Sequence, residues 1–216
     1  MSSPTSASAL APARPRLFAH IPEVPDFDPT TVKGQLTDDE KRTAIKVYAY
    51  FVGMDKKTSF APHVASRIKF AEMNFYGREL LGKKQKRSDG KGEPVVLPTS
   101  ESVLEVVVGE DMCNSFGVMH GGCAALFLDM ATVSCIVNYG IATGMDTTGV
   151  SHAMNVVYHQ PARIGRKIRI VARTMSMSGR IRTARGEMWD GDVLCTSCIH
   201  SIVNVSGKME RAGGKL

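Results

Sequence analysis

Residues 121–139 read GGCAALFLDMATVSCIVNY, and this stretch predicts a helix that is apolar on nearly every side. A helix of this kind belongs in the interior of a protein. Between His120 and Asp146 the only charged residue is Asp129. Because a buried carboxylate without partners is costly, we expect Asp129 to be paired, protonated or functional. An aspartate that only bonds a neighbouring backbone group is the structural alternative.

The segments on both sides of this helix predict an antiparallel sheet, one face of which has to be buried. Alternating or β-rich runs predict two strands before the helix, at 67–75 and 102–108, and a meander of four after it, at 149–158, 166–177, 180–189 and 193–205. Asp190-Gly191 is a hairpin signal between the last two. Strands and helices do not alternate, which argues against a parallel sheet. We therefore expect an α+β fold in which the central helix covers one face of the sheet.

The N-terminal part of the chain predicts a tail followed by one helix. Residues 1–35 are rich in Ser, Pro, Ala and Thr and predict a disordered tail, which leaves 36–210 as the folded domain. Thr37 and Glu40 have the spacing of a capping box and are followed by an apolar stripe to Val52. The run GKKQKRSDGKGEP at 82–94 predicts a basic loop insertion.

Charge and composition limit the class of partner. The net charge of +6 over 216 residues suggests an anionic partner, and phosphates on a small ligand fit as well as nucleic acid. No helix-turn-helix, zinc-finger or aromatic RNA-binding motif is present, so we expect no nucleic-acid partner. The longest apolar stretch, Cys123 to Val137, is shorter than the roughly 20 residues of a membrane span and contains Asp129. We therefore expect no membrane span.

The cysteines predict reduced thiols rather than a metal or redox site. Their number is five, an odd count that suits an intracellular protein. Cys195 and Cys198 have C-x-x-C spacing, but they lie in an expected strand, where residues three apart face opposite ways. The chain has no second pair of this kind, so we expect no metal.

The start of the central helix is suited to stabilise an oxyanion. His120-Gly121-Gly122 lets a ligand approach the backbone closely, and the free N–H groups of a first helical turn favour negative charge. Eight residues separate Gly121 from Asp129, or about 12 Å of helical rise. One reacting carbon cannot contact both ends of that distance. If both groups act on the same carbon, a second copy of the helix must supply one of them.

Two motifs resemble a known family. The run from Asn114 through Gly117, His120, Gly121 and Gly122, with Asp129 after it, resembles the signature of hotdog-fold thioesterases of the phenylacetate-degradation type, which include the eukaryotic acyl-CoA thioesterases. Residues 149–158, followed by Pro161-Ala162, resemble the strand that follows the helix in that family. The likeness covers roughly residues 100–205.

This resemblance implies a curved sheet wrapped around one long helix and a homodimer, or a dimer of dimers, with its sites at the interface. It implies an acyl-CoA substrate hydrolysed without a cofactor. The Gly121 amide would polarise the thioester carbonyl, and Asp129 of the other subunit would act as general base or nucleophile. Ser151 would place the water, Asn114 would orient the reacting end and His120 would support the helix start.

Substrate contacts beyond the reacting centre are expected at five further positions. Cations are needed for the phosphates of CoA, and Lys167, Arg180 and Arg182 are the candidates, with an ordinary solvated strand face as the alternative. Gly122 is expected at the substrate. His152 is expected either at the acyl pocket or, preferably, in packing.

Three other functions stay open at this point. Gly149-Val-Ser151-His-Ala153 comes close to the serine hydrolase motif G-x-S-x-G but lacks the second glycine. A hotdog dehydratase could use His120 and Asp129, and a sensor could bind acyl-CoA without turnover.

Arg14 and Arg16 suggest mitochondria, and the final Gly-Lys-Leu resembles a peroxisomal signal, so an intracellular location is expected without choice of compartment.

Overall fold

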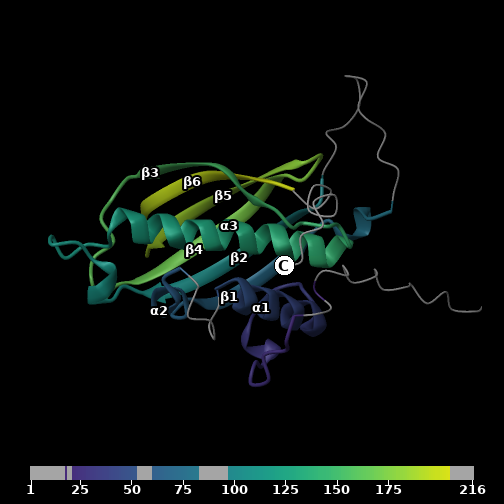
Figure 1. Cartoon of the computed structure of the whole chain (residues 1–216), viewed down its shortest axis with the longest axis horizontal. Helices are drawn as coiled ribbons and strands as arrows, with labels where there is room; N and C mark the ends of the chain where they lie inside the picture. The colour runs from purple at the N-terminus through teal and green to yellow at the C-terminus, as the bar shows by residue number, and fades with distance from the viewer. Residues whose placement is uncertain (1–17, 19–20, 53–59, 83–96, 205–216) are drawn as a thin grey trace, which may run out of the picture.

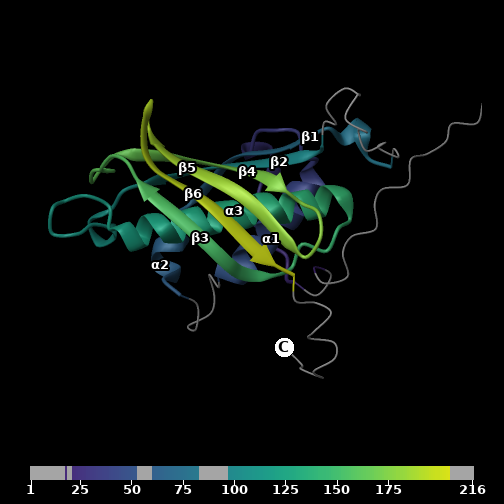
Figure 2. The ribbon, with the colours of Figure 1, turned by 90° about the horizontal axis from the view of Figure 1, so that it is seen from above.

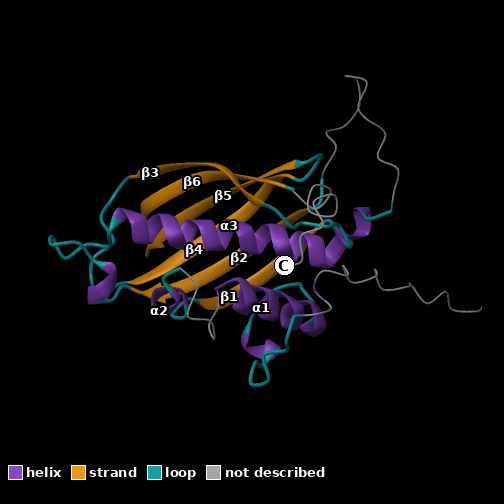
Figure 3. Cartoon of the chain, viewed as in Figure 1, coloured by secondary structure: helices purple, strands orange, loops and turns teal. Residues whose placement is uncertain are grey.

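A six-stranded antiparallel sheet wraps around one long helix, α3 (Gly121–Thr143), in the computed structural model (Figure 1). The structure describes residue 18 and residues 21–52, 60–82 and 97–204. Figure 3 shows α3 lying across the sheet, with a second helix, α1 (Asp38–Val52), beside it. The predicted α+β architecture is confirmed, and the central helix runs four residues further than the sequence suggested. Gly144, with a φ of 75°, ends it.

The strand order is β1-β2-β4-β5-β6-β3. Figure 2 shows β3 at one edge beside β6 and β1 at the other edge. The bounds are β1 Lys69–Tyr76, β2 Thr99–Val107, β3 Val150–Tyr158, β4 Lys167–Ser176, β5 Ile181–Asp190 and β6 Val193–Val203.

The predicted meander of four strands is therefore wrong for β3, although β4, β5 and β6 follow one another as expected. The sequence marks strands and turns, but the connection at 159–166 carries no signal for the edge to which β3 adds. This order leaves β3 paired on one side only, with β6. Most residues of β3 are exposed.

The core lies between α3 and the concave face of the sheet. Phe127, Leu128 and Ile136 of α3 are completely buried, together with Ile168 and Ile170 of β4. Gly186 of β5 allows the helix to approach, because a Cβ there would lie 3.0 Å from Leu128 Cδ2 and 3.1 Å from a methyl group of Thr132. Although α3 is long and apolar enough to cross a membrane, 67% of its most apolar window is buried in this core.

Helix α1 begins with the predicted capping box. The Thr37 amide donates to Glu40 Oε2 at 2.8 Å, and the Glu40 amide donates back to Thr37 Oγ1 at 3.3 Å. The helix packs its apolar stripe toward α3 and leaves Phe51 exposed. Shorter helical turns lie at η2 (Pro29–Thr31), α2 (Pro62–Ala65), η3 (Arg78–Leu80) and η4 (Glu110–Met112).

The predicted tail, 1–35, extends too far along the chain. Val32 is buried, the Lys33 amide donates to the Ala71 carbonyl at the edge of β1, and Glu23 forms a 2.8 Å ion pair with Lys46 of α1. Residues 21–35 therefore pack on the domain, because their few apolar side chains cover the first strand and helix. Residues 1–17, 19–20 and most of the predicted insertion, 83–94, lie outside the described residues.

Candidate active site around Asp129

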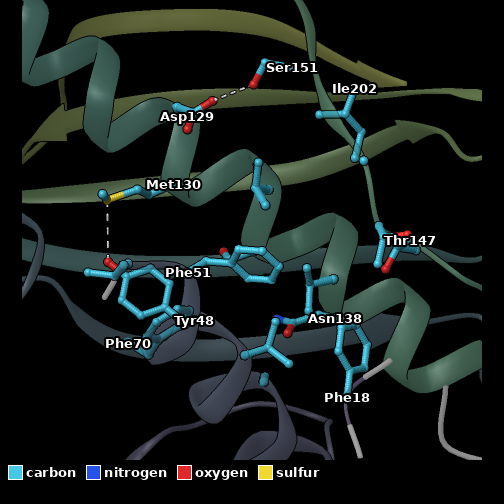
Figure 4. A pocket seen from close by; sticks show the side chains of 18 of the residues that line it. Phe18, Tyr48, Phe51, Phe70, Asp129, Met130, Asn138, Thr147, Ser151 and Ile202 are labelled. Carbon is cyan, nitrogen blue, oxygen red and sulfur yellow. Dashed lines mark hydrogen bonds between the residues drawn. The ribbon is translucent and has the colours of Figure 1, made fainter. Parts of the chain in front are cut away.

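The Asp129 carboxylate lies on the side of α3 that faces β3. Ser151 of β3 donates a hydrogen bond of 3.3 Å from Oγ to Asp129 Oδ1 (Figure 4). The Asp129 side chain is 41% exposed in the single chain, so the expectation of a fully buried acid is wrong. The helix is apolar around it, but this position looks out past the edge strand of the sheet, where a second chain could cover it.

A histidine that the sequence analysis missed completes this group. His200 of β6 is completely buried and lies 3.1 Å from Ser151 Oγ and 3.5 Å from Asp129 Oδ1 through its Nε2. Its Nδ1 lies 2.7 Å from Thr132 Oγ1. Burial lowers the pKa of His200, and the nearby Asp129 carboxylate opposes this by favouring the charged imidazolium. The imidazole is therefore held neutral.

The hydrogen-bond count shows that this group can hold one more proton. Thr132 donates its hydroxyl proton to the Leu128 carbonyl at 2.7 Å, so the contact with His200 needs a proton on Nδ1. Nε2 is then an acceptor. Ser151 has a single proton but contacts both Nε2 and the Asp129 carboxylate. With Asp129 ionised and His200 neutral, one of the two Ser151 contacts lacks a proton, so the group can accept one.

The start of α3 offers an amide without an acceptor. His120 is the N-cap, and its Nδ1 accepts the Gly122 amide at 3.0 Å. The Gly122 amide is thus occupied by the helix cap. The Gly121 amide has no intrahelical acceptor by position, and no side chain in the described residues accepts from it. Tyr158 packs against Gly121 and donates to its carbonyl at 2.9 Å, and a Cβ on Gly121 would lie 3.3 Å from the tyrosine ring.

Asn114 precedes this helix start in a turn closed by a bridge between Cys113 and Met119. Its Oδ1 accepts from the Phe116 amide at 3.0 Å, whereas its Nδ2 has no acceptor among the described residues. Asn114 therefore has a side-chain donor without a described acceptor in the segment that leads into α3.

The two halves of the candidate site do not meet within one chain. Gly121 and Asp129 lie in one continuous helix, so the rise between them is about 12 Å. A single reacting carbon needs both groups within hydrogen-bonding distance. If both groups act on one carbon, another copy of the chain has to supply one of them.

An apolar cavity of about 340 Å³ opens beside Asp129 and runs between α1 and α3. Figure 4 shows Asp129 and Ser151 at one end and Phe18 and Asn138 toward the other. Most of its wall is aliphatic or aromatic; the main contributors are Val47, Tyr48, Phe51, Phe70, Met130, Val133, Val137 and Ile202. The cavity has the shape and polarity that an acyl chain needs, and the carboxylate lies at its mouth.

The residues predicted to contact the substrate beyond the reacting centre lie in different environments. Lys167 forms a 2.6 Å ion pair with Glu105 on the face of the sheet away from α3. Arg182 is buried on the concave face, 6% exposed, so the alternative of an ordinary solvated strand face is wrong for it. Arg180 is exposed in the turn before β5. His152 is exposed at a bulge in β3 and does not line the cavity.

The signal for His200 was present in the sequence. Cys198, His200 and Ile202 alternate along β6 toward the core, so a titratable residue interrupts an apolar strand face. Ser151 was placed next to Asp129 only by resemblance. No described group of histidine, cysteine, aspartate or glutamate residues could hold a metal ion.

Comparison with known proteins agrees with this geometry. The model of the thioesterase superfamily matches residues 116–196, the segment that holds the helix start, Asp129 and Ser151. The matched segment of the chain, residues 116–196, is therefore similar to the thioesterase superfamily. It is 30% identical over 86 residues to acyl-coenzyme A thioesterase 13 of Homo sapiens, and 34% identical over 70 residues to the protein of that name of Mus musculus. These matches span 40% and 32% of this chain, and 59% and 47% of the relatives.

Solved structures extend the likeness to the fold. Zebra fish thioesterase superfamily member 2 aligns with a TM-score of 0.54 and 20% identity, over 75% of this chain and 96% of its own. The member 2 structure from Mus musculus gives a TM-score of 0.50 and 18% identity, over 74% and 93%. The expected hotdog fold is thereby confirmed.

The buried neutral His200 predicts an acid-sensitive fold. Its folded pKa is lowered, whereas the unfolded chain takes up a proton near pH 6.5. Below that pH the unfolded state binds the extra proton, so stability is full above it and falls by up to about 1.4 kcal/mol per pH unit below it. His200→Gln removes this contribution. Urea unfolding at pH 7.5 and 5.5 should show a smaller loss in the variant, and equal losses in both proteins would contradict a neutral His200.

Proposed function

We propose that this protein is an acyl-CoA thioesterase that hydrolyses acyl-CoA to a free acid and CoA. The observation that carries the proposal is the Asp129 carboxylate, hydrogen-bonded by Ser151 at the mouth of an apolar cavity, on the central helix of a segment similar to the thioesterase superfamily. The cavity receives the acyl chain. The thioester carbonyl then lies beside Asp129.

The hydrolysis needs a base and an oxyanion site. Asp129 accepts a proton from water as the water oxygen bonds to the carbonyl carbon, and the C–S bond then breaks as the proton passes to the CoA sulfur. A placed base contributes about 10²–10⁴ in rate. Ser151 orients the water, and His200 fixes the position of the Ser151 hydroxyl. The proton from water is taken up by the group of Asp129, Ser151 and His200, whose contacts lack one proton. Attack by Asp129 itself on the thioester is the alternative.

The oxyanion is stabilised by the partner subunit. In this proposal the Gly121 amide and Asn114 Nδ2 of a second copy donate to the carbonyl oxygen, and each such donor contributes on the order of 10²–10³. Both groups lack acceptors among the described residues, as groups that wait for a substrate oxygen would. His120 keeps the helix start in place by capping Gly122, which has no remaining donor for substrate. Of the candidate cations, Arg180 remains for the phosphates of CoA.

The second copy adds to the free edge of β3. This strand pairs with β6 on one side only, and its residues are largely exposed on both faces, including Val150, Val157 and Tyr158. An exposed edge strand that is apolar and uncharged favours pairing with another chain. Because Ser151 lies in β3 and Asp129 faces it, a copy added here covers the half-exposed carboxylate.

A serine hydrolase is the second candidate, because Ser151 Oγ lies 3.1 Å from His200 Nε2. Two observations weigh against it. Ser151 lies within β3 rather than in a strand–turn–helix elbow, and Nδ1 of His200 faces the Thr132 hydroxyl instead of a carboxylate. Inactivation by a serine-directed fluorophosphonate would favour this candidate over hydrolysis by water.

A dehydratase base at His120 is disfavoured because Nδ1 is used in the helix cap.

Asp129→Asn should lower kcat by at least about a hundredfold on a panel of acyl-CoA chain lengths, because the base is lost while size and hydrogen bonding are kept. Release of free CoA thiol is the measurement. Asp192→Asn, the same change at an exposed turn, is the matched control and should leave kcat unchanged. An Asp129→Asn protein that folds normally and keeps most of its turnover would remove this carboxylate from the mechanism.

Val157→Asp should convert the oligomer to monomers and abolish turnover, because two like charges meet across a two-fold interface at β3. We expect the dissociation constant, measured by analytical ultracentrifugation, to rise at least about a hundredfold. Val193→Asp is the matched control, since Val193 is 51% exposed against 46% for Val157 but lies at the start of β6. Turnover by a strictly monomeric protein would contradict the two-copy site.

A further inference from the structure

The cavity that opens beside Asp129 is polar at the end far from this carboxylate, whereas its walls are apolar. Asn138 of α3 and Thr147, in the connection to β3, line that end and are 1% and 2% exposed. Figure 4 shows both residues. Polar side chains buried to this degree normally have all their partners, because each unpaired group costs free energy.

Neither residue has the partners that its burial calls for. Asn138 Nδ2 donates to Ser102 Oγ at 3.0 Å, but no donor in the described part of the chain reaches Asn138 Oδ1. Thr147 Oγ1 has no hydrogen-bond partner among the residues that the structure describes and packs against Gly140. Asn138 Oδ1 is therefore an acceptor without a described donor in a residue that lines an otherwise apolar cavity, and Thr147 Oγ1 is a buried hydroxyl packed against Gly140.

We infer that this end of the cavity binds a hydroxyl group of the substrate, so that the preferred acyl chain is hydroxylated toward its end. The inference rests on the proposed thioesterase function and names its substrate class. Asn138 Oδ1 needs a donor, which a hydroxyl supplies and an oxo group does not. Among the described residues that line the cavity there is no lysine or arginine to pair with a carboxylate, and a buried unpaired charge would be costly.

The spacing along α3 fixes the scale of the chain. Asp129 and Asn138 are nine residues apart, about 13 Å of rise, and half a turn apart in direction, so the path between their side chains is longer than the rise. A fully extended chain of single bonds advances by about 1.2 Å per bond. A chain of about twelve carbons with a terminal hydroxyl is therefore the shortest that spans this rise when its carbonyl carbon lies at Asp129.

Binding of two CoA thioethers, which cannot be hydrolysed, tests the inference without relying on turnover. The probes are S-dodecyl-CoA and S-(12-hydroxydodecyl)-CoA, and the measurement is isothermal titration calorimetry on the full chain. We expect the hydroxylated probe to bind at least about tenfold more tightly, because it satisfies groups that the plain chain leaves unpaired. Equal binding, or tighter binding of the plain chain, would overturn the inference.

The variant is chosen so that it does not leave a new unpaired group. In Ser102→Ala/Asn138→Leu both partners of the internal hydrogen bond become apolar, and the preference should reverse toward S-dodecyl-CoA. Ser102→Ala alone keeps the Asn138 amide and should keep the preference for the hydroxylated probe. A preference that survives in the double variant would overturn the assignment to Asn138.

Turnover of dodecanoyl-CoA and 12-hydroxydodecanoyl-CoA, measured in parallel, separates the two proposals. Selective binding of the hydroxylated thioether without release of CoA from either thioester would support the polar cavity end and remove the thioesterase function. Hydrolysis of both thioesters, together with tighter binding of the plain thioether, would support the thioesterase function and overturn the hydroxyl-binding cavity end.

Discussion

The burial of α3 against the sheet is the constraint on which the site depends. One continuous helix packs along the core of the sheet, so its two ends cannot bend toward each other. Gly186 brings the helix to within contact of β5, which holds Asp129 opposite Ser151 and His200. The same rigidity separates Asp129 from the Gly121 amide. Under the proposed function, a single chain thus holds only half of the reaction centre.

The arrangement around Asp129 explains how a carboxylate on an apolar helix can be both stable and reactive. Its cost of burial is reduced because the position is partly exposed in one chain and because Ser151 donates to it. His200 behind Ser151 is buried and neutral, so the group as a whole lacks one proton for its contacts. A site that gains a hydrogen bond when it takes up a proton is suited to removing one from water.

Much of the fold could be predicted because the helix and the strands have strong local signals. The apolar run at 121–139, the Thr37–Glu40 capping box and the Asp190-Gly191 turn each correspond to a local backbone requirement. The position of β3 and the packing of residues 21–35 depend on which surfaces meet, and no local pattern reports that. Asp129 was found because it is the one charged residue in an apolar helix. His200 was missed although it interrupts the apolar face of β6, and Asn138 was missed because a single polar residue in an apolar helix has no spacing that marks it.

Mixed dimers test the division of the site between two chains most directly. Differently tagged Asp129→Asn and Asn114→Ala chains are co-expressed, and the heterodimer is isolated on both tags. If the site is shared between two chains, the heterodimer has one centre that combines intact Asp129 of one chain with intact Asn114 of the other. The account therefore predicts about half of the wild-type kcat for the heterodimer, whereas each homodimer is inactive. A heterodimer as inactive as its parents would show that both groups act within one chain and would contradict the account.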